Sequence, residues 1–89
     1  MDIHKHAFAG TMESSDAYVE IEPSQNGLEI EVESIVKNQF GENIEKAVKD
    51  VLGEQGVENA LVRVRDRGAL KCVIRARVET AVLRGREEL

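Results

Sequence analysis

The chain has 89 residues, 42% of them hydrophobic, and a formal net charge of −5 at pH 7. It is long enough for one domain with one modest core, and its composition is typical of a folded rather than a disordered chain. The chain is acidic, and its only aromatic residues are Phe8, Tyr18 and Phe40, so it lacks the basic, aromatic surface typical of nucleic-acid binding.

The absence of certain sequence features indicates the cellular compartment. Cys72 is the one cysteine, so an internal disulfide is excluded and a reducing compartment is favoured. No apolar run approaches the roughly 20 residues of a membrane-spanning helix. The N-terminus shows no apolar core of a signal peptide. These features predict a cytoplasmic protein without a membrane partner.

Residues 1–8 contain His4 and His6 in a His-x-His pattern. Two ligands are too few for a tetrahedral metal site, and the chain has no further histidine to complete one. An exposed polar tail or an edge segment is the better interpretation, so we expect no metal site.

A stretch of small and hydroxylated residues follows at positions 9–16, with the sequence Ala-Gly-Thr-Met-Glu-Ser-Ser-Asp. Its glycine leaves the backbone free to turn, so we expect the stretch to be exposed. A catalytic serine needs a base within hydrogen-bond reach, and the nearest bases, His4 and His6, lie in a terminal segment. Ser14 and Ser15 therefore resemble attachment points, and no catalytic residue is predicted.

Two alternating segments come next. In residues 17–22 and 28–36 every second side chain is apolar, which is the pattern of half-buried strands, and Glu29, Glu31 and Glu33 form the outer row of the second segment. The sequence Pro-Ser-Gln-Asn-Gly at residues 23–27 predicts a turn between them. These features predict an antiparallel hairpin.

The period then changes to that of a helix. In residues 42–53 the apolar side chains Ile44, Ala47, Val48, Val51 and Leu52 follow one helix face. Gly53 and Gly56 are expected to end this helix. Its start is either at Gly41 or further back, through Phe40. Residues 60–65 predict a third strand, broken by Asp-Arg-Gly at 66–68.

The last segment has two interpretations. Residues 70–78 alternate as a strand would, but the apolar pattern of a helix continues through residues 81–83. Its length favours a helix. The chain is therefore predicted to be a small single α+β domain, with a mainly antiparallel sheet and one or two helices packed on one face.

Charge is distributed unevenly along the chain. Residues 1–58 contain 13 Asp or Glu and 4 Lys or Arg, for −9, whereas residues 59–89 contain 4 and 8, for +4. Such a dipole favours docking in an assembly. The alternative is a solvated face with local ion pairs, formed by the basic stripe of Arg63, Arg65, Arg67, Arg75 and Arg77.

Three separated blocks resemble one family over nearly the whole chain. These are residues 9–16, Asn-Gln-Phe-Gly at 38–41, and Asp-Arg-Gly-Ala-Leu-Lys-Cys at 66–72. In order and spacing they are similar to the citrate lyase acyl carrier protein, the gamma subunit of citrate lyase. The chain lacks the Asp-Ser-Leu motif of the familiar helical acyl carriers and is too strand-rich for their bundle, so the resemblance is to the citrate lyase type alone.

The resemblance implies an attachment site. The family's serine after the glutamate aligns with Ser14, and Ser15 is the chemical alternative. Ser14 would be linked through a phosphodiester to 2'-(5''-phosphoribosyl)-3'-dephospho-CoA, whose terminal thiol holds an acetyl or citryl group. The chain would then be one acyl carrier domain, 1–89, whose flexible N-terminal segment 1–16 carries the attachment serine.

The resemblance also implies partners. These are the citrate lyase alpha and beta subunits, which exchange acetyl for citrate and cleave the citryl thioester to oxaloacetate, and a prosthetic-group transferase, the holo-citrate lyase synthase. Glu13 and Asp16 would help that transferase recognise the loop, bind a metal ion during transfer, or only solubilise a turn. Cys72 lies in an apolar stretch and is expected to be a small buried side chain rather than an acyl-bearing thiol.

Two other functions compete with this one. The same type of arm serves malonate decarboxylase carriers, although the Phe-Gly and Gly-Ala-Leu sequences favour citrate lyase. An unmodified scaffolding or regulatory module that docks through its charge dipole is the second. An independent enzyme is disfavoured, because the chain is small and shows no base, metal cluster or phosphate loop.

Overall fold

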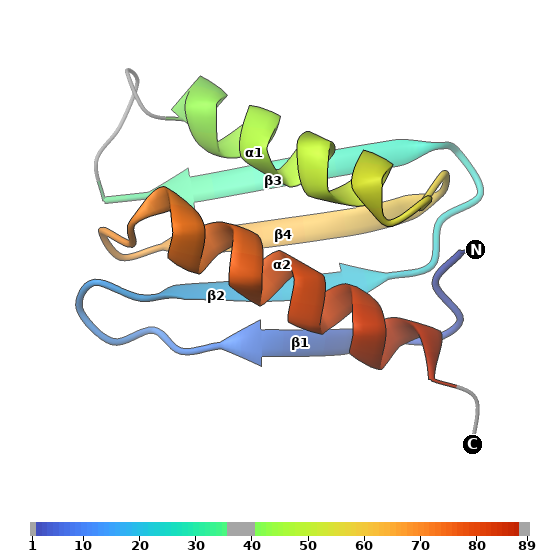
Figure 1. The fold of residues 1–89 in the computed structure, drawn as a ribbon, viewed down its shortest axis with the longest axis horizontal. Coiled ribbons are helices and arrows are strands. Elements are labelled where there is room, and N and C mark those ends of the chain that lie inside the picture. Colours follow the sequence, from blue (N-terminus) through green and yellow to red (C-terminus); the bar gives the residue numbers. More distant parts are fainter. Residues whose placement is uncertain (1, 36–40, 88–89) are drawn as a thin grey trace.

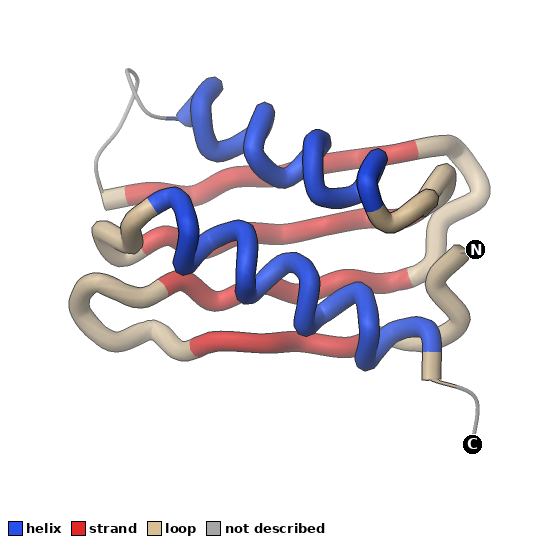
Figure 2. The backbone as a smooth tube through the Cα atoms, viewed as in Figure 1, coloured by secondary structure: helices blue, strands red, loops and turns tan. Residues whose placement is uncertain are grey.

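The computed structural model describes residues 2–35 and 41–87. The elements follow in the order β1 (Ala7–Gly10), β2 (Ala17–Glu22), β3 (Leu28–Ser34), α1 (Gly41–Glu54), β4 (Ala60–Asp66) and α2 (Lys71–Arg86). Figure 1 shows both helices on one face of a single sheet, and Figure 2 shows the same two layers by type of structure. The predicted α+β class is confirmed.

The sheet has the strand order β1-β2-β4-β3. The pairs β1/β2 and β2/β4 are antiparallel, whereas β3 pairs with β4 in parallel. The predicted hairpin between residues 17–22 and 28–36 is therefore wrong, because β4 lies between these strands. The chain leaves β3, crosses the face of the sheet as α1 and returns as β4, which is the usual connection of a parallel pair.

The charges of the strands agree with this order. Arg63 of β4 lies opposite Glu20 of β2 and Glu31 of β3 in the register of the sheet. A direct pairing of β2 with β3 would have set one row of glutamates beside another, and like charges on neighbouring strands destabilise a sheet. The basic strand separates the two acidic strands.

The core lies between the sheet and the helices. The inward side chains of β2 and β4 are at most 1% exposed, and they are Ala17, Val19, Ile21, Ala60, Val62 and Val64. The helices cover them with Ile44, Ala47, Val48, Val51, Leu52, Ile74, Val78, Ala81 and Val82. Full burial of a side chain such as Val or Leu stabilises the fold by about 1.5–3 kcal/mol. The predicted apolar faces of β2 and α1 are confirmed, and the predicted third strand is β4.

The end of α1 differs slightly from the prediction. Gly53 lies within the helix, which runs to Glu54. Gly56 has a φ of +70°. The N–H groups of Gly56 and Val57 donate to the carbonyl oxygens of Gly53 and Leu52, the pair of bonds that closes a helix in a Schellman motif. Among the described residues α1 begins at Gly41, and the question of Phe40 lies outside them.

The ambiguous last segment is the helix α2, so the strand interpretation of residues 70–78 is wrong. Ile74 and Val78 face the core, whereas Leu70 is 71% exposed. Cys72, in the first turn of the helix, is exposed, which contradicts the expected burial of this side chain. The helical period, not the alternation, selects which of these apolar residues reach the core.

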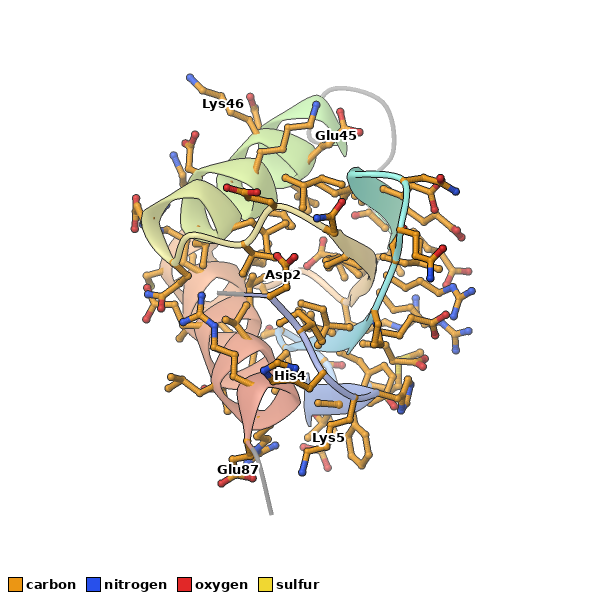
Figure 3. All side chains as sticks on the ribbon, turned by 90° about the vertical axis from the view of Figure 1, so that its right-hand side faces the viewer. Asp2, His4, Lys5, Glu45, Lys46 and Glu87 are labelled. Atoms are coloured by element: carbon orange, nitrogen blue, oxygen red, sulfur yellow. The ribbon has the colours of Figure 1, made fainter. Side chains whose placement is uncertain are left out.

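The N-terminal segment contains β1, a strand that the pattern of the sequence did not predict. The Asp2 carboxylate accepts hydrogen bonds from the backbone N–H groups of Glu58 and Asn59 at 2.9 and 3.2 Å. His4 and Lys5 donate their backbone N–H groups to Gly85 O at 2.8 and 3.2 Å. Figure 3 shows this end of the domain, with Asp2 and His4 labelled. The expected flexibility of residues 1–16 concerns motion and stays a prediction.

Candidate functional site

The connection between β1 and β2 contains a tight turn with Ser14 at its corner. The Asp16 N–H donates to Glu13 O at 3.2 Å, so Ser14 and Ser15 are the central residues of a four-residue turn. Ser15 has a φ of +66°. A positive φ at the third position is the mark of a type II turn. The Ser14 side chain is exposed, as the sequence predicted.

The backbone of Ser15 is bonded to the body of the domain. Its N–H donates to Arg67 O at 2.7 Å, and the Arg67 N–H donates to Asp16 O at 2.9 Å. The turn is thus held against the connection between β4 and α2. The Ser15 side chain is also exposed, but Ser15 occupies the left-handed position that non-glycine residues rarely adopt. Ser14 is free of both constraints.

The Asp16 carboxylate is the most heavily bonded group of this loop. Arg77, from α2, donates from Nε to Oδ1 at 3.0 Å and from Nη2 to Oδ2 at 2.9 Å. The Thr11 hydroxyl donates to Oδ2 at 2.6 Å, and the Ala17 N–H donates to Oδ1 at 2.7 Å. These bonds from Arg77, Thr11 and Ala17 hold the pKa of the Asp16 carboxyl far below its usual range.

Gly10 makes room for this arrangement. Its φ is +93°, and a Cβ at this position would lie 1.8 Å from Ala17 O and 3.2 Å from Cδ of Arg77. The glycine therefore allows the end of β1 to approach β2 and allows the Arg77 stem to pass towards Asp16. The sequence predicted that this glycine leaves the backbone free to turn. The structure adds a second reason for a glycine here, which is the close approach of Ala17 and Arg77.

A buried carboxylate supports the neighbouring connection. Asp66 is 4% exposed at the end of β4. Its Oδ1 accepts the N–H groups of Gly68 and Ala69 at 3.2 and 2.9 Å, and its Oδ2 accepts the Ser34 hydroxyl at 2.8 Å. Arg67 lies between Asp66 and Gly68 in the sequence, and its backbone bonds Ser15 and Asp16 of the turn. The Asp-Arg-Gly sequence at residues 66–68, predicted to break the strand, therefore also forms the loop to which the turn containing Ser14 is bonded.

A pocket of about 600 Å³ lies between the N-terminal turns of the helices. Its lining includes Lys46 and Lys71. It also includes Asp66 and Gly68, the neighbours of Arg67 in the sequence. The Asp66 carboxylate is already occupied by the three donors above. The pocket borders the loop that follows β4, and its described lining does not pair a nucleophile with a base.

The remaining predicted residues lie apart. His6 Nε2 is 2.9 Å from Glu20 Oε2, so this histidine interacts across β1 and β2. Within residues 2–35 and 41–87, no group of three or more His, Cys, Asp or Glu side chains could hold a metal ion. No helix in the same ranges is long and apolar enough to cross a membrane.

Most of the basic stripe pairs with acids of the other half of the chain. Arg63 lies 3.5 Å from Glu22 and 3.7 Å from Glu31, and Arg65 lies 3.7 Å from Glu33. Arg75 pairs with Glu54 at 2.8 Å, and Arg77 with Asp16. The uneven charge of the sequence is thus interleaved in space, as the alternative of local ion pairs predicted. The sequence did not identify Arg77 as part of the site, because no spacing rule connects it to Asp16.

Comparisons with known proteins indicate a family. The acyl carrier protein family model described as "Malonate decarboxylase delta subunit (MdcD)" matches residues 4–85. "Citrate lyase acyl carrier protein 2" of Salmonella typhimurium (strain LT2) is 53% identical over 89 residues, which cover 99% of this chain and 92% of that protein. The "Citrate lyase acyl carrier protein" of Clostridium perfringens is 50% identical over 88 residues, which cover 98% of this chain and 87% of that protein.

A solved structure is also similar. A chain in the crystal structure of a Pseudomonas malonate decarboxylase hetero-tetramer in complex with malonate superposes with a TM-score of 0.75 at 29% identity. The match covers 88% of this chain and 80% of that one.

Proposed function

The chain belongs to the acyl carrier protein family of citrate lyase and malonate decarboxylase, and we propose that it is the carrier subunit of a citrate lyase, with its arm on Ser14. The observation that carries the attachment site is the turn of residues 13–16. It places the Ser14 hydroxyl at an exposed corner while the backbone on its C-terminal side is bonded to Arg67.

The group on Ser14 is 2'-(5''-phosphoribosyl)-3'-dephospho-CoA, linked through a phosphodiester. When attached, it supplies the thiol that holds an acetyl or citryl group as a thioester. The residues of this chain fit such a group. Ser14 offers an exposed hydroxyl, and the neighbouring Asp16 charge is compensated by Arg77, which lowers the repulsion that a new phosphodiester would meet.

The chain itself positions and does not catalyse. A tether fixed to an ordered domain makes the meeting of acyl group and active site an intramolecular event, with an effective concentration of the order of millimolar when its reach matches the gap. The alpha and beta subunits of citrate lyase would supply the catalytic residues, and the holo-citrate lyase synthase would install the arm. The complex would operate in the cytoplasm, where the thiol is kept reduced.

The intact mass of the chain purified from its native host during growth on citrate tests the proposal. We expect a mass increase equal to the phosphoribosyl dephospho-CoA group, located on Ser14 by peptide mapping. The variant Ser14→Ala should lose this increase and all lyase activity while it retains the fold. The matched variant Ser15→Ala should retain both.

Two results would contradict the proposal. An unmodified chain in cells that are fermenting citrate would favour a scaffolding module. Retained turnover in the double variant Ser14→Ala/Ser15→Ala would exclude a carrier role for this turn. Modification on Ser15 would move the site but not the function.

Sequence similarity favours citrate over malonate. The chain is about half identical to citrate lyase carriers over nearly its full length, but 29% identical to the matched chain of the malonate decarboxylase structure. Reconstitution separates the two. The modified chain should restore citrate cleavage to carrier-depleted citrate lyase, and it should not restore malonate decarboxylation to the other complex.

A further inference from the structure

The bonding of Asp16 accounts for all of its acceptor capacity. An ionised carboxylate has about four lone-pair positions. Oδ1 accepts from Arg77 Nε and the Ala17 N–H, and Oδ2 accepts from Arg77 Nη2 and the Thr11 hydroxyl. The Asp16 side chain is 14% exposed. This carboxylate is therefore directed into the domain, and it has no lone pair left for a metal ion or a partner protein.

The donors come from both ends of the attachment loop and from α2. Thr11 begins the loop and Ala17 follows it, while Arg77 lies near the middle of α2. The Thr11 hydroxyl also accepts the Glu13 N–H at 3.2 Å. One carboxylate thus connects the entrance of the loop, its exit and a helix of the core. The turn that contains Ser14 lies between these fixed points.

We infer that the Asp16–Arg77 pair is a positioning device that holds the Ser14 turn in the conformation used by the enzyme that attaches the arm. The inference rests on the proposed function and assigns a role to Arg77. In the attachment step, Ser14 Oγ forms a bond to phosphorus of a triphosphate-activated donor of the arm. A phosphoanhydride bond of that donor breaks, diphosphate leaves, and the serine proton passes to the transferase or to water.

Position matters more for this step than for folding. The serine oxygen must lie about 3–3.5 Å from phosphorus and in line with the leaving group, and a misplacement of 1 Å can lower a rate about 100-fold. A partly exposed ion pair contributes little to global stability by comparison. Loss of Arg77 should therefore slow attachment far more than it lowers the melting temperature.

The experiment compares two arginines of the same helix. Arg77→Gln removes the two hydrogen bonds that the guanidinium group donates to Asp16. The matched control, Arg75→Gln, removes the hydrogen bonds that Arg75 Nη2 donates to both carboxylate oxygens of Glu54, at 2.8 and 2.9 Å. Each purified unmodified chain is incubated with the transferase and the triphosphate donor, and kcat/KM of attachment is measured from intact masses.

We expect kcat/KM to fall about 10- to 100-fold for Arg77→Gln and to change less than about twofold for Arg75→Gln. Asp16→Asn, which removes the charge at nearly constant shape, should resemble Arg77→Gln and serves if that variant fails to fold. The conservative Arg77→Lys keeps the charge without the fork and should recover part of the rate.

Hydrogen exchange supplies a readout that does not depend on the transferase. The Ser15 N–H, bonded to Arg67 O, should exchange faster in Arg77→Gln than in wild type, while the N–H of Val64 in β4 stays equally protected. Accelerated exchange of both would indicate loss of global stability instead, and would overturn a local positioning role.

The remaining outcomes separate the inference from the proposed function. Equal attachment rates in wild type and Arg77→Gln would overturn the inference and leave the carrier function intact. A wild-type chain that gains no mass would overturn the carrier function and, with it, the inference.

Discussion

Ser15 donates its backbone N–H to Arg67 O at 2.7 Å, which connects the turn of residues 13–16 to the loop between β4 and α2. These two residues are far apart in the sequence. Their contact brings the Asp-Arg-Gly sequence at residues 66–68 next to the turn that contains Ser14. The predictions below test the parts of this arrangement.

The buried Asp66 should be essential for the structure of the loop between β4 and α2. Asp66→Ala would leave the Ser34 hydroxyl and the N–H groups of Gly68 and Ala69 without their acceptor. We expect the free energy of unfolding to fall by about 3 kcal/mol. Chemical denaturation measures this loss, and Asp50→Ala is the control.

Asp50 is exposed on α1, so its replacement removes the same charge without a buried network. The control should change the free energy of unfolding by no more than about 0.5 kcal/mol. Equal effects of the two substitutions would mean that the Asp66 hydrogen bonds contribute nothing specific.

Two glycines with positive φ should respond differently to alanine. At Gly10 the new Cβ would overlap Ala17 O, whereas at Gly27 it would meet nothing within 4 Å. We expect Gly27→Ala to cost about 1–2 kcal/mol, from the left-handed backbone alone. Gly10→Ala should cost at least about 3 kcal/mol, because backbone strain adds to it.

Thermal and chemical denaturation compare these variants. Gly10→Ala should also slow arm attachment, because the new Cβ would lie only 3.2 Å from Cδ of Arg77 and would crowd the stem of that side chain. If Gly10→Ala were no more destabilising than Gly27→Ala, the close approach of β1 and β2 at this point would be wrong.

The helix glycines should give changes of opposite sign. Gly53 lies in α1 with open space around its Cβ position, so Gly53→Ala should stabilise the chain by about 0.5–1 kcal/mol. Gly85 lies in α2, and its added Cβ would be 3.0 Å from Ile3 Cγ2. Gly85→Ala should therefore destabilise the chain by about 1 kcal/mol or more, despite its better helix propensity.

The Gly85 result reports on the N-terminal segment. A stabilising Gly85→Ala would show that Ile3 does not pack against α2 as closely as described. Ile3→Ala, which removes the Cγ2 atom that the new Cβ would meet, should relieve part of the cost in the double variant, and the double-mutant cycle measures this coupling.

The depressed pKa of Asp16 predicts how stability depends on pH. A carboxyl group whose pKa is lower in the folded than in the unfolded state contributes stability above the unfolded value, and this contribution is lost as the pH falls towards the folded value. The difference in unfolding free energy between wild type and Asp16→Asn should therefore be constant above about pH 5 and shrink as the pH falls from about 5 to about 2. Urea denaturation across this range measures the difference.

A constant difference over the same range would mean that Asp16 does not titrate with folding. Asp2, whose carboxyl pKa is also lowered, mainly by the Glu58 N–H and the Asn59 side chain, adds a dependence of the same sign. Because Asp2 is present in both proteins, its contribution cancels in the comparison with Asp16→Asn.

Much of the fold could be predicted from periodicity. The alternation of Val19 and Ile21 identified the inner face of β2, and the spacing of Val48, Val51 and Leu52 identified that of α1. The expected burial of Cys72 was wrong, because it was inferred from the apolar stretch around this residue, whereas in the helix α2 the Cys72 side chain is exposed. Ser14 was found from the resemblance of its neighbourhood to a family, and its attachment remains to be measured.

The sequence by itself determined which face of β2, β3 and α1 is apolar, because that depends only on the spacing of side chains along one backbone. Only the tertiary structure decided which elements are neighbours. β4 lies between β2 and β3, where its arginines separate two acidic strands. Arg77 reaches Asp16 because α2 crosses the sheet above the end of β1, where Gly10 leaves space for it. Pairings across such distances depend on where the whole chain folds, and no local period specifies them.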